Sequence, residues 1–221
     1  MPGRHSGEAQ LELSLAEQML LLMEVRDGQL LSGGSLSAAA ALVELALERR
    51  ISCKDPEPST KLPMSRKLVV IDPNPIGIAE ADRVLELMVA DSKPRSSYSM
   101  VARMAGPVDI IIGKSLADQG LVERLHPKGF VDHSLQYRLL NREAQRSARE
   151  SASAVRVALA HTTDPRLGAT VDLIRNGPDL MSGEAGSGLQ PTLLFTGYPD
   201  DIRGVIESIL RAAGVANSGA S

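Results

Sequence analysis

The chain has 221 residues, 43% of them hydrophobic and 23% charged, which is typical of a globular protein with one domain or at most two small ones. A formal net charge of -3 argues against a general nucleic-acid binder, and an aromatic content of 2% without Trp leaves no platform for stacking bases. The single cysteine, Cys53, excludes an intramolecular disulfide and a cysteine-built zinc site, and we expect it to be a small core residue rather than a nucleophile.

No stretch of the sequence has the properties of a leader peptide or a membrane span. Residues 1–10 lack an apolar signal region and predict a flexible tail. The longest apolar candidate is interrupted by Glu24, Arg26 and Asp27, well short of the roughly 18 apolar residues that a span requires. We therefore expect a cytoplasmic protein, and any contact with a membrane is expected to be peripheral.

Two apolar helices within residues 13–50 are expected to form the centre of the fold. Ser14 and Glu17 have the S-x-x-E spacing of a capping box directly before an apolar run, so the first helix should begin there. A second, alanine-rich helix is predicted at about residues 36–49, where small side chains let neighbouring helices approach closely. A short polar turn with glycines, at residues 27–34, joins them. Helices this apolar lie inside a bundle.

After this pair the sequence predicts a long-looped hairpin and an amphipathic helix. Residues 50–53 can form a short strand, and the β-branched run at 67–71 can pair with it across the Pro-rich loop 54–63. The amphipathic helix is predicted at residues 80–91, and Lys93-Pro94 closes it.

The middle of the chain predicts two helices followed by a second hairpin. A shorter helix is predicted at residues 97–105, and Pro107 suits the first turn of another helix that runs to Gln119. Strands are then predicted at residues 121–125 and 130–136, joined by a turn that contains a proline and a glycine.

Three further helices are predicted in the C-terminal part of the chain. Asn141 and Asp200 each suit an N-cap, and Pro165 suits the first turn of the helix between them. The glycine-rich segment 177–191 is expected to be mobile. The predicted helix bounds are 141–161, 164–177 and 200–214.

These elements predict a mainly α fold class. We expect a single helical-bundle domain over residues 11–214, with buried central helices, surrounding amphipathic helices and small β-hairpins, and a flexible tail at residues 215–221. The order of the elements does not show the alternating strands and helices of a parallel sheet.

Patterns that resemble catalytic motifs fail on their spacing. Gly113-Lys114-Ser115 looks like the end of a phosphate-binding loop, but Val108 stands where that motif needs a glycine, and the triplet falls inside a predicted helix. Asp132-His133-Ser134 holds the residue types of a catalytic triad, yet consecutive strand residues point to opposite faces. No pair of histidines has metal-binding spacing. The sequence therefore predicts neither an enzyme nor a metal or cofactor site.

A run of arginines follows the predicted second hairpin. If these residues are helical, they face one way and can meet anionic lipid headgroups or nucleic-acid phosphates. The alternative is a solvated face on which Glu143 and Glu150 alternate with the arginines. The arginines are Arg138, Arg142, Arg146 and Arg149.

The tip of the same hairpin carries Lys128, Phe130 and Val131. An exposed Phe beside a Lys suits insertion into a membrane interface or contact with a partner, and it equally suits a hairpin folded back on the core.

Several leucine-rich motifs, in this order and spacing over roughly residues 11–165, resemble the Golgi phosphoprotein 3 family, and the composition is similar to that of a bacterial member. The resemblance implies a single mostly helical domain and a non-enzymatic adaptor. In the Golgi members it implies binding of phosphatidylinositol 4-phosphate on a basic face and a hairpin used for membrane contact and self-association. The motifs are L-S-L-A-E-Q-M-L-L-L (13–22), V-E-L-A-L-E-R-R-I (43–51), R-K-L-V-V (66–70), E-A-D-R-V-L-E-L-M (80–88), S-K-P-R (92–95) and S-L-A-D-Q-G-L-V (115–122).

The resemblance also assigns positions. The family holds the headgroup with a Trp before the second core helix, an Arg in that helix and two Arg in the helix before the hairpin. Alignment on V-E-L-A-L places Ala38 at the first Arg and Gly106 and Asp109 near the later two, so the headgroup site is not retained, whereas the hairpin carries over as residues 121–137. Glu44 sits where the family has it, and we interpret it as a structural ion-pair or capping partner because a buried carboxylate otherwise needs neutralising.

Three hypotheses follow. In the first, the chain is a peripheral lipid-binding adaptor that uses the hairpin and the arginine run on an anionic lipid or membrane surface. In the second, it is a protein–protein scaffold or regulatory module without lipid contact, which forms homo-oligomers through the hairpin. A third and weaker hypothesis is a winged-helix DNA reader, but the candidate recognition helix carries Ile110, Ile111 and Ile112, which suit a core face better than a DNA groove, so nucleic acid is not expected.

Overall fold

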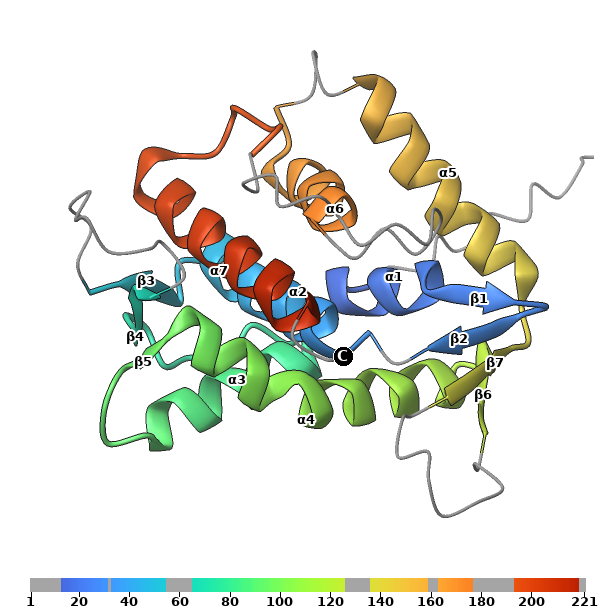
Figure 1. The fold of residues 1–221 in the computed structure, drawn as a ribbon, viewed down its shortest axis with the longest axis horizontal. Coiled ribbons are helices and arrows are strands. Elements are labelled where there is room, and N and C mark those ends of the chain that lie inside the picture. The colour runs from blue at the N-terminus through green and yellow to red at the C-terminus, as the bar shows by residue number, and fades with distance from the viewer. Residues whose placement is uncertain are drawn as a thin grey trace, which may run out of the picture.

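The computed structural model describes residues 13–31, 33–54, 65–125, 136–158, 163–176 and 193–218. Within these residues it has seven helices and two small antiparallel sheets, which confirms the predicted mainly α fold class (Figure 1). In chain order the elements are α1 (Leu15–Leu22), β1 (Glu24–Arg26), β2 (Gln29–Leu31), α2 (Gly34–Leu47), β3 (Ile51–Cys53), β4 (Lys67–Val70), α3 (Ala79–Ala90), β5 (Arg95–Ser96), α4 (Ser97–Asp118), β6 (Val122–Leu125), β7 (Gln136–Leu139), α5 (Arg142–Ala158), α6 (Pro165–Asn176) and α7 (Asp200–Ser218).

The helices α1 and α2 lie at the centre of the molecule, as predicted. The capping box of α1 is present: the Ser14 hydroxyl accepts the Glu17 N–H, and the Glu17 carboxylate accepts the Ser14 N–H. Every residue of α2 from Leu36 to Ala46 is buried. Helices α1, α3, α4, α6 and α7 all pack on α2, because its alanines let them approach closely (Figure 1).

The connection between α1 and α2 is a hairpin, and the prediction of a short polar turn there was wrong. Strands β1 and β2 pair around Asp27 and Gly28, whose φ angles of 46° and 80° are those of a two-residue hairpin turn with both residues left-handed. Strand β2 also pairs with β7, with Leu30 opposite Tyr137, to give a sheet in the order β1-β2-β7-β6. Strands of three residues are too short to show an alternating pattern, and this pair is completed by a strand from far along the chain.

The second sheet, in the order β3-β4-β5, confirms the predicted pairing of residues 51–53 with 67–70. Ile51 lies opposite Val70 and Cys53 opposite Leu68. Cys53 is 8% exposed, in agreement with its expected place in the core. The two-residue strand β5 was not predicted, because Arg95 and Ser96 carry no strand signal of their own.

Helix α4 is one continuous helix, and the prediction of two helices with a break before Pro107 was wrong. A proline inside a helix removes one backbone hydrogen bond and strains the preceding turn, at a cost of about 3 kcal/mol. Burial offsets that cost, since the apolar face of α4 continues through the proline and lies against α2. The members of this face are Met100, Val101, Met104, Val108, Ile112 and Leu116.

The last three helices begin where they were predicted to begin. The Asn141 side chain accepts N–H groups of the first turn of α5, and Asp164 does the same for α6. Helix α7 packs on α2, α4 and α6 and runs past its predicted end at Gly214 to Ser218. The segment 177–191, predicted to be mobile, lies outside the described residues.

The segment that precedes α7 is held in place by a buried carboxylate. Asp172 of α6 is 0% exposed, and it accepts the Leu194 N–H at 2.7 Å and the Tyr198 hydroxyl at 2.9 Å. The Phe195 and Tyr198 rings meet edge to face, with centroids 4.8 Å apart. These contacts fix the start of α7 against α6.

Candidate functional site

Arg138 lies on a strand, so the four arginines are not one helical stripe. It belongs to β7, directly opposite Glu123 of β6, and the two side chains are 3.5 Å apart and more than half exposed. Its neighbour Tyr137 faces the opposite way and is 1% exposed. The expectation of one helical face was wrong at this residue because the long helix begins only at Arg142.

The other three arginines are on α5 and all are exposed, but they differ in their partners. Arg149 pairs with Glu24 at 2.8 Å, at the point where α5 passes the β1–β2 hairpin. Arg142 and Arg146, one helical turn apart, have no ion-pair partner among the described residues. Arg142 and Arg146 are therefore the members of the predicted stripe whose positive charge is not compensated by an ion pair.

Glu24 is held as an anion by its neighbours. Partial burial alone would raise its pKa, but hydrogen bonds from Gln145 and from the Gly28 N–H, together with the charge of Arg149, keep the pKa below its usual value. Glu24 therefore neutralises Arg149 at physiological pH.

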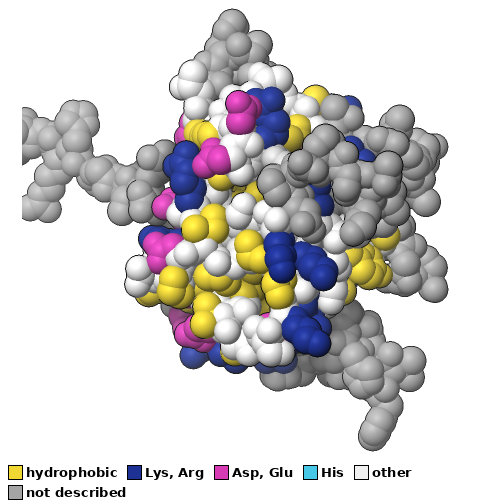
Figure 2. Space-filling view, turned by 90° about the vertical axis from the view of Figure 1, so that its left-hand side faces the viewer, with side chains coloured by type: hydrophobic (Ala, Val, Ile, Leu, Met, Phe, Trp, Pro, Cys, Tyr) yellow, Lys and Arg dark blue, Asp and Glu magenta, His cyan; other side chains and the backbone are white. Residues whose placement is uncertain are grey.

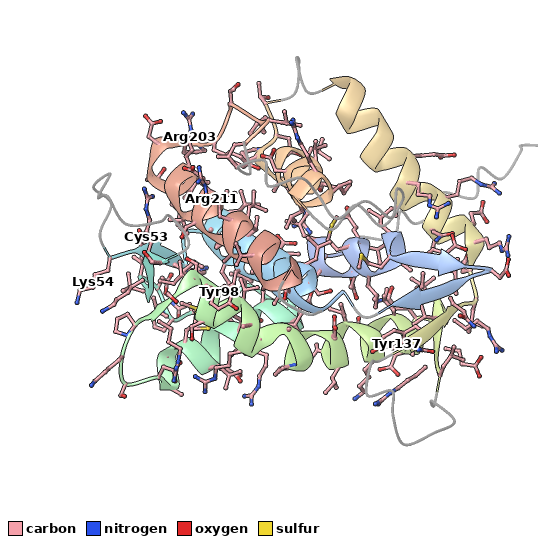
Figure 3. All side chains as sticks on the ribbon, in the orientation of Figure 1. Cys53, Lys54, Tyr98, Tyr137, Arg203 and Arg211 are labelled. Carbon is pink, nitrogen blue, oxygen red and sulfur yellow. The ribbon has the colours of Figure 1, made fainter. Side chains whose placement is uncertain are left out.

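The hairpin is attached to the helical core by Tyr137. Its ring lies against Gly113 of α4, where an added Cβ would come within 2.0 Å of the Tyr137 hydroxyl oxygen, and that hydroxyl donates to the Asp109 carbonyl at 3.0 Å (Figure 3). Burial, and then the negative charge of Asp109, raise the pKa of Tyr137. The predicted tip residues Lys128, Phe130 and Val131 lie outside the described residues, as does most of the predicted strand 130–136; the described strand continues to Leu139.

The three positions that align with the family's headgroup arginines hold no basic residue. Ala38 is 0% exposed inside α2, and Gly106 is exposed on the outer side of α4. Asp109, also on α4, is 1% exposed, and its carboxylate accepts the Gly34 N–H at the start of α2 at 2.9 Å.

Glu44 is buried and has partners on two other helices. It is 2% exposed, and its Oε1 accepts the Leu15 N–H at 2.9 Å and lies 2.8 Å from the Arg166 guanidinium. Burial raises the pKa of Glu44, and Glu80 raises it further, whereas the Leu15 N–H and Arg166 oppose the shift. The carboxylate is thus a cap for α1 and an ion-pair partner for α6.

Two more buried glutamates meet Glu44 at the start of α1, and sequence reasoning missed this cluster. Glu80 of α3 accepts the Ser14 hydroxyl, and Glu17 accepts the Ser115 hydroxyl of α4 at 2.6 Å. Burial raises the pKa of Glu80, and the charges of Glu17 and Asp82 add to the effect. The capping box predicted the role of Glu17 within α1, but nothing local indicated that α2, α3, α4 and α6 supply its surroundings.

The glycine–lysine–serine triplet that resembles a phosphate-binding loop does not form a loop. Helix α4 runs without interruption through Gly113, Lys114 and Ser115, and the Ser115 hydroxyl donates a hydrogen bond to the Glu17 carboxylate. No three side chains among the His, Cys, Asp and Glu that the structure describes are grouped so that they could hold a metal ion. None of the described helices is both long and apolar enough to cross a membrane.

A buried helix pair, wrapped by amphipathic helices and carrying a hairpin on a small sheet, defines a helical-bundle protein. The family model of Golgi phosphoprotein 3 (GPP34) matches residues 15–178, about three quarters of the chain. The chain therefore belongs to the Golgi phosphoprotein 3 family, a family of non-enzymatic adaptors, as its motifs predicted. Among curated proteins, no match to the chain was found.

Proposed function

We propose that this chain is a non-enzymatic adaptor that binds anionic membrane surfaces peripherally from the cytoplasmic side, without the headgroup pocket of its family. Arg142 and Arg146 of α5 are the cationic contact, and the hairpin 121–137, with Lys128, Phe130 and Val131 at its tip, is the second contact. Family membership supports the adaptor role. The observation that carries the membrane contact is the pair of exposed arginines without ion-pair partners among the described residues.

The place of these arginines suits a flat anionic surface. They follow directly on β7, so they share one end of the molecule with the base of the hairpin (Figure 1). Each basic residue near an anionic membrane surface contributes about 1 kcal/mol of binding free energy. Two such residues give weak, salt-sensitive binding, so the hairpin tip or several copies of the chain must contribute for binding to be stable.

Co-sedimentation with liposomes tests this proposal. The wild-type chain should pellet with phosphatidylcholine vesicles that contain an anionic lipid, less so in high salt, and not with phosphatidylcholine alone. Arg142→Glu/Arg146→Glu should weaken binding by about thirtyfold or more, because roughly 2 kcal/mol of attraction is lost and repulsion is added.

The matched control is Lys54→Glu/Lys67→Glu, which makes the same change of charge on the second sheet, where both lysines are exposed. This variant should keep most of the binding. The proposal is wrong if the wild-type chain stays in the supernatant at low ionic strength, or if the two double variants lose binding equally.

A second candidate function, a protein–protein scaffold that self-associates through the hairpin, is favoured by the mixed charge of the surface. Arg138 and Arg149 are each matched by a glutamate of the same chain. Figure 2 shows the face at the left of Figure 1, near the second sheet: apolar side chains gather in its centre, with Lys, Arg, Asp and Glu interspersed around them. A surface of both signs suits a protein partner.

Sedimentation over a range of protein concentrations distinguishes the scaffold function from the membrane adaptor. The scaffold predicts a dimer or larger species that is lost on Phe130→Asp, with no pelleting by anionic vesicles. A monomer at every concentration contradicts it.

A further inference from the structure

Two lysines lie directly opposite each other on the second sheet, and no described residue forms an ion pair with either of them. The Lys54 N–H donates to the Lys67 carbonyl at 2.9 Å, which continues the register in which Cys53 lies opposite Leu68. Opposite residues of antiparallel strands carry their side chains on the same face, with Cβ atoms about 5 Å apart. Both lysines are exposed, and Figure 3 shows Lys54 pointing away from the molecule.

This lysine pair differs from the other cations on the same sheet, which are matched by carboxylates. Arg50, which precedes β3, pairs with Asp72, and Arg95 of β5 pairs with Asp91 at 2.7 Å. Like charges directly opposite each other on a sheet are destabilising. A carboxylate bound between the two ammonium groups would remove this repulsion.

An apolar strip continues from the lysines along the same face. Because side chains alternate along a strand, Val69 and Ile71 share the face of Lys67, whereas Leu68, 1% exposed, points to the core. Ile71 is 59% exposed, and its N–H is bonded to the Arg50 carbonyl at 2.8 Å, so its backbone is fixed in the ladder. At about 3.3 Å per residue, Ile71 lies about 13 Å from Lys67.

We infer that this face of the second sheet, made by Lys54, Lys67, Val69 and Ile71, is a docking site for an acidic, extended segment of a partner protein. The segment places two adjacent acidic side chains against the lysines, where charge-assisted hydrogen bonds form. About four extended residues further on, it places an apolar side chain against Ile71.

The distribution of charge favours a peptide over a membrane as the occupant. Positive charge without an ion-pair partner among the described residues is confined to the lysine end, since Arg50 at the Ile71 end is paired with Asp72. A membrane is anionic over its whole area and would bring headgroups against Asp72, where like charges repel. A peptide can carry its acidic residues at one end only.

The inference goes beyond the proposed function and does not depend on it. The second sheet lies at one end of the molecule, and the start of α5 and the base of the hairpin lie at the other (Figure 1). An adaptor with this arrangement holds a partner at the end that faces away from its membrane contacts.

The test uses the full isotope-labelled chain and a synthetic peptide that has two adjacent glutamates and, about four residues on, a leucine. The amide NMR signals of Lys54, Lys67 and Ile71 should shift as the peptide is added. A matched peptide with glutamines in place of the glutamates should bind about tenfold more weakly or less, because two ion pairs are lost.

Lys54→Glu is the decisive variant. It places a carboxylate opposite Lys67, so repulsion within the pair becomes attraction, and the chain should resist urea at least as well as the wild type. Its affinity for the acidic peptide should nevertheless fall by about tenfold or more, which unfolding would not explain. Lys114→Glu makes the same change of charge at an exposed residue of α4 and should bind the peptide as the wild type does.

The inference is overturned if the wild-type signals do not shift, if both peptides bind equally, or if Lys54→Glu keeps its affinity. If Lys54→Glu does not fold, Lys54→Gln decides in the same way. Loss of vesicle binding by Lys54→Glu/Lys67→Glu would also overturn it, because the face would then be a membrane contact. Arg142→Glu/Arg146→Glu should keep the peptide affinity, so failure of the membrane proposal leaves this result standing.

Discussion

Glu17, Glu44 and Glu80 place three carboxylates at one helix start, with Arg166 as their only ion-pair partner in the described residues. Burying charge is costly unless hydrogen bonds and opposite charge compensate it. The compensation is incomplete, since burial raises the pKa of both Glu44 and Glu80. The cluster links α1 to α2, α3, α4 and α6, and it does so at some expense of stability at neutral pH.

This balance predicts a pH dependence that can be measured on one residue. A carboxyl group whose pKa is raised in the folded state stabilises the fold when it is protonated. This contribution is fully present at pH values below 4.5, the pKa of the group in the unfolded chain, and it is lost as the pH rises through the pKa of the folded state. Glu80→Gln keeps an acceptor for the Ser14 hydroxyl and cannot ionise. Its free energy of unfolding, relative to wild type, should therefore increase between pH 4.5 and pH 7.

Urea unfolding at a series of pH values measures this difference. Glu86→Gln, on the exposed side of the same helix, is the control and should show no such trend. A Glu80→Gln difference that stays constant or falls with rising pH would contradict the argument.

At the scale of elements, the hairpin is held to α4 by the contact of Tyr137 with Gly113. An alanine is about 1 kcal/mol better than a glycine inside a helix, so the sign of a glycine-to-alanine change depends on the space available. At Gly113 a Cβ would lie 2.0 Å from the Tyr137 hydroxyl, whereas at Gly106 nothing lies within 4 Å.

We therefore expect Gly113→Ala to destabilise the protein by about 1–3 kcal/mol and Gly106→Ala to stabilise it by up to about 1 kcal/mol. Urea unfolding of the two variants measures both changes. Equal effects would show that the ring of Tyr137 moves away without cost, and that the hairpin is not fixed to α4 as described.

At the scale of the whole molecule, α7 lies beyond the residues that the family model matches and still belongs to the core. Ser208 of α7 and Ser97 of α4, both 0% exposed, form a hydrogen bond of 2.7 Å, and Arg66 donates to the Gly204 carbonyl. Apolar residues of α7 such as Ile206 are as fully buried as those of α2.

Ile206→Ala should thus lower the free energy of unfolding by about 2–5 kcal/mol, as should Leu42→Ala in α2. Both residues are 0% exposed. Each variant should unfold in one transition with an unchanged slope in urea, because the two helices share one core. A separate early transition for Ile206→Ala would mean that α7 is an independent unit, and it would count against the single domain that the sequence predicts.

The sequence by itself determined the elements whose signals are local. The capping box at Ser14, the buried alanines of α2, and the caps at Asn141 and Asp164 all involve residues within a few positions of each other, where side chains compete directly for the same backbone groups. The order of its motifs also identified the family.

Only the tertiary structure decided what depends on residues far apart in the chain. Gly34 and Asp109 are separated by 75 positions, and Ser14 and Glu80 by 66. The pairing of β2 with β7, and the burial that carries α4 through Pro107, are likewise long-range. Such contacts arise when hydrophobic burial brings elements together, and burial is non-directional, so no periodicity in the sequence records which polar groups will meet.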